Sequence, residues 1–133
     1  MKKRILIIDD DEDILDILHI IFRDEGFNVV TSNTGEAAEN IHIINPDLIL
    51  LDVRLAGSSK SGDQICAEIK ANYPENKLPV VLVSAETNLE LLANQCGADF
   101  YIKKPFDIYD LLLKVKRSLA WFKRQARSAL QFS

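Results

Sequence analysis

Five short apolar runs alternate with longer amphipathic segments, and this alternation most restricts what the chain can fold into. The runs predict strands at residues 5–8, 28–32, 47–52, 79–84 and 98–103. The other segments, near 12–25, 34–44, 62–72 and 88–96 and from 107 onward, have the spacing of helices. The runs "LILL" and "VVLV" are apolar at every position, as in strands covered on both faces. The pattern therefore predicts a parallel sheet in a three-layer α/β/α sandwich.

Helix-ending residues agree with this division of the chain. Gly26, Pro46, Pro74 and Gly97 each follow one of the predicted helices. The length of 133 residues and a hydrophobic content of 47% suit one compact globular domain. The apolar run behind the basic amino terminus is too short for a signal-peptide core, and no stretch approaches a membrane span.

The cysteines and the charges indicate the cellular compartment and the class of ligand. Cys66 and Cys96 form no metal-binding spacing and lie in apolar segments, so we expect reduced core residues in a cytoplasmic protein. All 20 Asp and Glu lie in residues 1–110, which hold ten Lys or Arg, whereas residues 111–133 hold six basic residues. An acidic body argues against nucleic acid as the main ligand of this domain.

Polar residues gather at the carboxyl ends of the predicted strands. Asp9 and Asp10 follow the first strand and Lys104 follows the fifth. Asp52 ends the third strand, and Ser84 ends the fourth. Open parallel sheets bind ligands at this edge, so we expect these side chains to converge. Three carboxylates in one place need a cation, and oxygen ligands suit Mg²⁺ or Mn²⁺.

The same edge suits phosphoryl transfer. A cation, Lys104 and the Ser84 hydroxyl would together neutralise a transferring phosphoryl group. The best nucleophile there is a carboxylate, which would form an acyl phosphate. Asp11, Glu12 and Asp13 have a different explanation, because acidic residues are favoured at a helix start; we expect Asp11 to be the N-cap.

Four motifs resemble the receiver domains of two-component response regulators, over residues 3 to about 120. They are "ILIIDDDEDIL", "PDLILLDVRL", "PVVLVSAE" and "ADFYIKKPF". The resemblance implies a flavodoxin-like, doubly wound sheet in the order 2-1-3-4-5. It also implies a signalling switch that catalyses its own phosphorylation and dephosphorylation but turns over no external substrate. A sensor histidine kinase or histidine phosphotransfer protein would supply the phosphoryl group.

The resemblance assigns roles to the residues of the sheet edge. Asp52 would be the phosphoacceptor, and it would bind the metal with Asp9, Asp10 and the backbone carbonyl of Arg54. The remaining assignments are Ser84 and the Ala85 N–H as phosphoryl ligands, Lys104 as the family's lysine in a cis bond to Pro105, and Tyr101 with Ser84 as the switch. The face formed by helix 4, strand 5 and helix 5 would then change to regulate a partner or output domain.

One loop departs from the family. After the acceptor the family usually reads Met-Pro-x-x-Asp-Gly, whereas this chain reads "RLAGSSKSG", without proline and with Gly62 two residues later. We expect a longer and more flexible loop. Separately, Arg54 and Glu86 lie two residues beyond Asp52 and Ser84, so a pair between them would hinder an attacking water and lengthen the phosphorylated lifetime.

Two questions stay open at this level. A haloacid-dehalogenase-type phosphohydrolase also uses an aspartyl phosphate, and Asp9 and Asp11 superficially fit its Asp-x-Asp pattern. The chain lacks, however, the late acidic pair on a strand after Lys104 that this type of enzyme has. The tail is the second question, because an apolar seam with a 3.5-residue period continues past residue 120. Residues 1–120 form the predicted receiver domain. Residues 121–133 are either a basic, overlong end of the last helix or a linker or dimerisation segment. A homodimer could instead form through the face of helix 4, strand 5 and helix 5.

Overall fold

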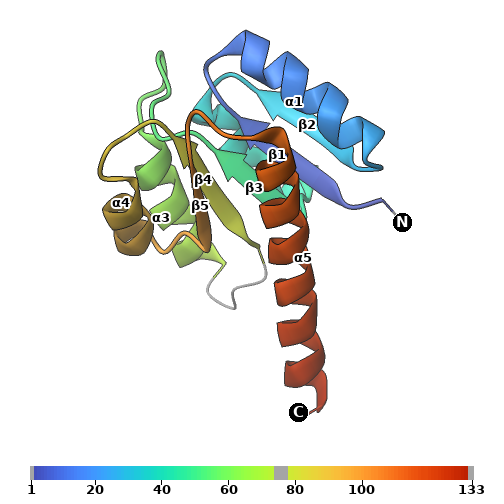
Figure 1. Cartoon of the computed structure of the whole chain (residues 1–133). Coiled ribbons are helices and arrows are strands. Elements are labelled where there is room, and N and C mark those ends of the chain that lie inside the picture. The colour runs from blue at the N-terminus through green and yellow to red at the C-terminus, as the bar shows by residue number, and fades with distance from the viewer. Residues whose placement is uncertain (1, 74–77, 132–133) are drawn as a thin grey trace.

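The computed structural model describes residues 2–73 and 78–131, with residues 125–131 as backbone only. One five-stranded parallel sheet runs in the order β2-β1-β3-β4-β5 (Figure 1). Its strands are β1 (Arg4–Ile8), β2 (Asn28–Ser32), β3 (Leu48–Leu51), β4 (Val80–Ser84) and β5 (Phe100–Lys103). The helices are α1 (Glu12–Asp24), the 3₁₀ helix η1 (Gly35–Asn40), α2 (Ile41–Ile44), α3 (Gly62–Asn72), α4 (Leu89–Cys96) and α5 (Ile108–Gln131). The predicted sandwich and strand order are confirmed.

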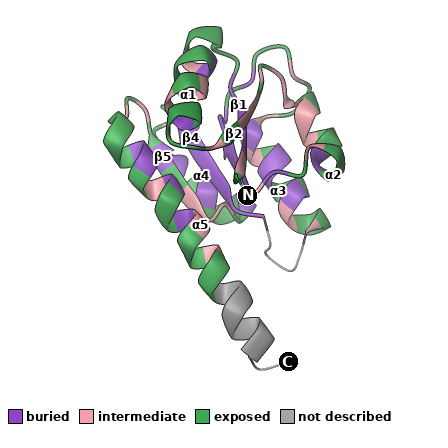
Figure 2. Ribbon diagram, turned by 90° about the vertical axis from the view of Figure 1, so that its right-hand side faces the viewer, coloured by how far each residue is buried: buried purple, intermediate pink, exposed green. Residues whose placement is uncertain are grey.

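Alternate residues of the central strands build two separate cores. Ile5 and Ile7 of β1 face a layer formed by α1 and α5, whereas Leu6 and Ile8 face α2, α3 and α4. Figure 2 shows the buried strands between these two layers. Residues on both faces avoid water, which is why these strands read as continuous apolar runs. The core on the side of α2, α3 and α4 contains Cys66 and Cys96 as buried free thiols.

The helix predicted over residues 34–44 is wrong in type. Residues 35–40 form the 3₁₀ helix η1, and only Ile41–Ile44 form α-helix. Thr34 makes no side-chain cap hydrogen bond, and the segment begins at Gly35, a residue of low helix propensity. A single turn of α-helix then ends at Asn45, which has a left-handed φ of 52°.

Other helix ends follow the predicted signals. Asp11 caps α1, because its side chain accepts hydrogen bonds from the N–H groups of Asp13 and Ile14. Gly97 caps α4 with a left-handed φ of 78°. Pro74, the signal predicted after the third helix, lies outside the described residues. Among the residues that the structure describes, no helix is long and apolar enough to span a bilayer.

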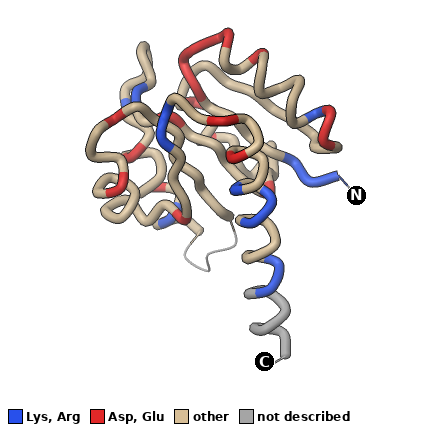
Figure 3. The backbone as a smooth tube through the Cα atoms, viewed as in Figure 1, with Lys and Arg blue, Asp and Glu red and all other residues tan. Residues whose placement is uncertain are grey.

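Helix α5 runs on beyond the sheet, with Lys and Arg along its exposed length (Figure 3). Leu112 and Val115 pack in the core, and Leu119 packs against it. Farther along, the Phe122 ring lies 5.7 Å from Lys70 Nζ, and Trp121 is 37% exposed. The apolar seam predicted past residue 120 includes Ala126 and Ala129, whose side chains lie outside the described part of the chain.

Candidate phosphoacceptor site

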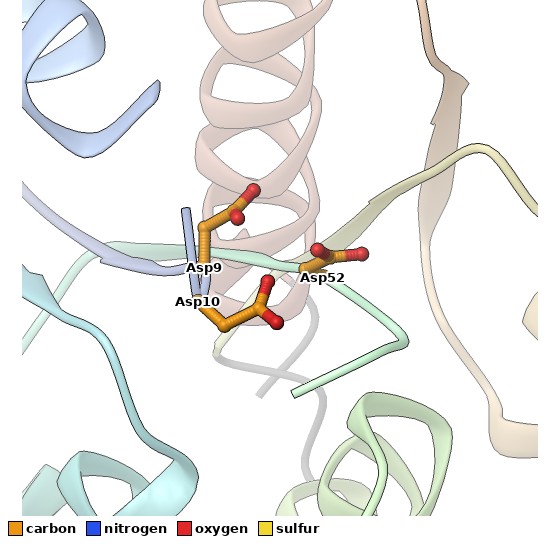
Figure 4. Close-up of side chains that lie close together, drawn as sticks. All are labelled: Asp9, Asp10 and Asp52. Atoms are coloured by element: carbon orange, nitrogen blue, oxygen red, sulfur yellow. The ribbon is translucent and has the colours of Figure 1, made fainter. Parts of the chain in front are cut away.

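Three carboxylates meet at the carboxyl edge of the sheet. Asp9 and Asp10 follow β1, and Asp52 follows the neighbouring strand β3. The Asp52 N–H donates to the Ile8 carbonyl at 2.9 Å, so the two strand ends stay in register. One oxygen from each carboxylate lies within 4.8 Å of the others (Figure 4). The predicted convergence of these three residues is therefore present.

Lys104 enters the same cluster from the end of β5. Its Nζ donates to Asp9 Oδ2 at 2.8 Å and to Asp52 Oδ2 at 3.3 Å. The Lys104 N–H donates to the Ser84 carbonyl at 2.9 Å, which places the lysine across the end of β4. The peptide bond from Lys104 to Pro105 is cis.

Burial controls the electrostatics of the site. Asp52 is only 7% exposed, and this burial raises the pKa of its carboxyl above the usual value; the charge of Lys104 opposes the rise, whereas the charge of Asp9 adds to it. Burial alone would lower the pKa of Lys104, but its hydrogen bond to Asp9 and the charge of Asp52 raise it. Lys104 therefore stays charged between two carboxylates.

The carboxylates fit a divalent cation by charge and by chemistry. Asp9, Asp10 and Asp52 bring three negative charges, and the neighbouring Lys104 neutralises one. Asp9 and Asp52 are buried, so the remaining repulsion acts in a medium that screens charge weakly. Oxygen ligands of this kind, on an edge open to water, suit Mg²⁺ or Mn²⁺.

An open pocket of about 440 Å³ lies over this cluster. Ser84 and Ala85 line it beside Asp52 and Lys104. The Ser84 Oγ accepts a hydrogen bond from the Glu86 N–H at 3.3 Å, which fixes the loop after β4. The pocket therefore brings a hydroxyl and a cationic side chain next to a carboxylate.

Arg54 and Glu86 form an ion pair beside the same pocket. Arg54 Nε donates to Glu86 Oε1 at 2.5 Å, and both residues line the pocket. The Arg54 N–H also hydrogen-bonds the Asp52 carboxylate, which lowers the pKa of Asp52 and offsets part of the rise that burial causes. The predicted metal contact from the Arg54 carbonyl stays a prediction.

Tyr101 lies apart from the carboxylates. It pairs with Leu82 in the ladder between β4 and β5, and its side chain is 39% exposed. It lines a separate hollow with residues of α4 and α5, including Lys114 and Arg117. Its assignment as a switch also stays a prediction.

The long loop after β3 returns to Asp52 at Gly62. A Cβ atom at Gly62 would lie 1.9 Å from the Asp52 carbonyl oxygen, so no larger residue fits without backbone movement. The sequence did not reveal a further contact of this loop: the Ala56 N–H donates to Asp10 Oδ2 at 3.1 Å. A backbone donor has no side-chain signature, and the missing proline was the one available signal.

The structure gives the haloacid-dehalogenase alternative no support. That pattern requires the Asp11 carboxylate in the site, but Asp11 Oδ1 accepts the backbone N–H groups of Asp13 and Ile14 at 3.0 and 3.3 Å. Asp11 therefore uses its side chain to cap α1. Its backbone N–H alone reaches the cluster, donating to Asp9 Oδ1 at 2.9 Å.

Comparisons with known proteins agree with one another. Residues 5–116 match the response regulator receiver domain family. NtrX from Brucella abortus is 36% identical over 97% of this chain with a TM-score of 0.87, and the chain spans 29% of its length. A CheY-like receiver domain protein from Methanospirillum hungatei JF-1 is 31% identical, with a TM-score of 0.85; the match covers 94% of this chain and 99% of that one.

The receiver domain of NtrX from Brucella abortus, solved separately, is 38% identical with a TM-score of 0.79. That match covers 87% of this chain and 98% of the receiver domain. The family match covers most of the chain, and the sheet order and the acidic edge agree with it. The chain therefore belongs to the response regulator receiver domain family of two-component signalling systems.

Proposed function

We propose that this chain is a phosphorylation-dependent switch in which Asp52 accepts a phosphoryl group from a histidine kinase or phosphotransfer protein. The observation that carries the proposal is the contact of Lys104 Nζ with both Asp9 and Asp52 at the carboxyl edge of the sheet. It supports the proposal because the Lys104 cation and the Asp52 carboxylate nucleophile would act in one pocket, beside the acidic pair Asp9 and Asp10 that would bind the metal.

In the transfer, an Asp52 oxygen attacks phosphorus and the bond from phosphorus to the donor's imidazole nitrogen breaks. Lys104 neutralises charge that gathers on the phosphoryl oxygens, and the Ser84 hydroxyl and the Ala85 N–H hold the product. Mg²⁺ or Mn²⁺ would be held by Asp9, Asp10, Asp52 and the Arg54 carbonyl. The bound cation would supply further positive charge to the phosphoryl oxygens. We expect the chain to catalyse its own phosphorylation and dephosphorylation but to turn over no external substrate.

An apolar hollow supports docking of a protein phosphodonor. Ile14, Ala85, Pro105 and Phe106 line it together with Lys104, directly beside the acceptor. Such a surface fits an apolar helix face of a partner, which would bring its phosphohistidine over Asp52. The proposal sets the chain in the cytoplasm, where Cys66 and Cys96 stay reduced.

The output follows from the residues around Ser84. Movement of the Ser84 hydroxyl toward the phosphoryl group would free space for Tyr101 to reorient. The face of α4, β5 and α5 would then bind a target protein, an output domain or a second copy of the chain. The hollow that Tyr101 lines with Lys114 and Arg117 supports this assignment.

Arg54 and Glu86 are assigned to the lifetime of the acyl phosphate. Their ion pair joins two residues that line the pocket, where it would hinder an attacking water. Arg54→Ala or Glu86→Ala is expected to speed dephosphorylation of Asp52, measured as decay of the label after donor removal. Decay at the wild-type rate in both variants would remove this role.

Labelling of Asp52 tests the proposal. The chain is incubated with Mg²⁺ and acetyl phosphate, and the phosphorylated fraction is measured by intact-mass spectrometry, for wild type against Asp52→Asn. We expect one phosphoryl group per chain in the wild type and none in the variant, because the amide is not a nucleophile. Labelling that persists in the variant would overturn the proposal, and steady phosphate release from an aryl phosphate would indicate a phosphohydrolase.

A further inference from the structure

The three carboxylates of the acidic cluster do not all share the same hydrogen-bond partners. Lys104 Nζ binds Asp9 and Asp52, and the backbone N–H groups of Asp11 and Arg54 add to the hold on these two. Asp10 is held instead by the loop after β3, through the Ala56 N–H at 3.1 Å from Oδ2. This donor comes from a part of the chain 46 residues away.

A tight turn presents the Ala56 N–H. The Ser58 N–H donates to the Leu55 carbonyl at 3.1 Å, and Gly57 has a φ of +81°. Among the described non-glycine residues only Asn45 has a positive φ, so Ala56 does not. A four-residue turn with a positive φ at its third residue alone is a type II turn, and Ala56 is its second residue.

The loop is also fastened on its far side. The Gly35 N–H donates to Ser58 Oγ at 2.9 Å, which joins the turn to the start of η1. The turn residues therefore contact both Asp10 and the segment after β2. These two hydrogen bonds fix the position from which Ala56 reaches the acidic pair.

The identity of residue 56 decides whether this donor exists. The second position of a type II turn favours proline, whose ring presets the required φ. The receiver-domain pattern Met-Pro-x-x-Asp-Gly has proline at this position, four residues after the residue that corresponds to Asp52. Proline has no N–H, so it would keep the turn and lose the hydrogen bond to Asp10.

We propose that the Ala56 N–H is a positioning donor that orients Asp10 for divalent cation binding; this inference rests on the proposed function. A carboxylate has two oxygens, so Oδ2 can hold the N–H while Oδ1 faces the cation. Outer hydrogen bonds of this kind orient ligands before the metal arrives, and their loss lowers metal affinity. Cation binding and the order of the turn then stabilise each other.

Ala56→Pro tests the inference because it suits the turn and removes only the donor. Mg²⁺ is titrated into the full chain without a phosphodonor, and dissociation constants are read from amide chemical shifts. We expect Ala56→Pro to bind Mg²⁺ about tenfold more weakly than wild type. Ala56→Ser, which keeps the N–H, is the matched control and should bind within about twofold of wild type.

A second readout follows the hydrogen bond itself. In the absence of metal, the Ala56 amide proton of the Asp10→Asn variant should resonate upfield of its position in wild type. The reason is that a neutral amide oxygen is a weaker hydrogen-bond acceptor than a carboxylate. Equal Mg²⁺ affinity in wild type and Ala56→Pro, or an Ala56 amide proton that ignores Asp10→Asn, would overturn the inference. Wild type that binds Mg²⁺ and is labelled on Asp52 would leave the proposed function standing in either case; wild type that does neither would remove both.

Discussion

At the scale of single residues, Asp52 combines burial with a charge that its neighbours only partly neutralise. Its pKa is raised by burial, so the ionised carboxylate destabilises the folded, metal-free protein. Lys104 limits this cost by contacting Asp9 and Asp52 at once. Under the proposed function, a bound cation would neutralise the negative charge that Lys104 leaves.

Asp52→Asn is expected to stabilise the metal-free protein at pH 7 by about 1 kcal/mol, or roughly 3–5 °C in melting temperature. The folded protein binds the Asp52 proton more tightly than the unfolded chain does, so wild-type stability falls as pH rises from the usual carboxyl pKa to the raised one. Below the usual carboxyl pKa, Asp52 is protonated in both the folded and the unfolded wild type. Wild type and Asp52→Asn should then have similar melting temperatures. Thermal melts from pH 3 to 8 measure this, and a less stable variant at pH 7 would contradict it.

At the scale of elements, the start of α1 divides the acidic run between two tasks. Asp9 and Asp10 precede the helix and belong to the cluster, whereas Asp11 satisfies the free N–H groups of the first turn. Glu12 and Asp13 lie in that first turn, where the helix dipole favours negative charge. One short segment therefore supplies both the proposed metal ligands and a helix cap.

Substitutions in this segment should separate the two tasks. Asp11→Ala should cost about 1 kcal/mol of unfolding free energy through loss of the cap and leave Mg²⁺ affinity within about twofold. Asp10→Ala should weaken Mg²⁺ binding at least tenfold without loss of stability, since it removes a repelling charge. Urea unfolding and Mg²⁺ titration of both variants measure this. A large loss of Mg²⁺ affinity in Asp11→Ala would contradict the division.

At the scale of the whole molecule, the two cores hold the sheet while the chemistry stays on one edge. Lys70 and Asp99 form an ion pair at 2.5 Å between α3 and the segment before β5, and both side chains are mostly buried. Lys70 also lies near the Phe122 ring of α5. The extended helix is thus connected to the domain as far as Phe122, although Trp121 is left partly exposed.

Removal of the tail tests its role in self-association. We expect the full chain to sediment as a dimer at tens of micromolar and a chain ending at Leu119 as a monomer. The apolar seam in the sequence continues through Phe122 past residue 120, and Trp121 beside it is partly exposed. Added salt should favour the dimer by screening the basic side chains. Trp121→Ala in the full-length chain should also sediment as a monomer, because it removes the exposed apolar side chain and keeps the rest of the tail. If both chain lengths sediment as monomers, the tail has no dimerising role; Asp52 labelling should be equal in both.

Local patterns in the sequence determined the strands, most helices and the residues of the carboxyl edge. Apolar runs report burial on both faces, and parallel strands bring their ends together, so the approach of Asp52 to Asp9 and Asp10 was predictable. Tertiary structure alone decided that the Ala56 N–H donates to Asp10 and that the Gly35 N–H donates to Ser58 Oγ. Both depend on how the long loop packs between distant segments, and backbone donors are present at every residue except proline, so the sequence does not mark which of them acts.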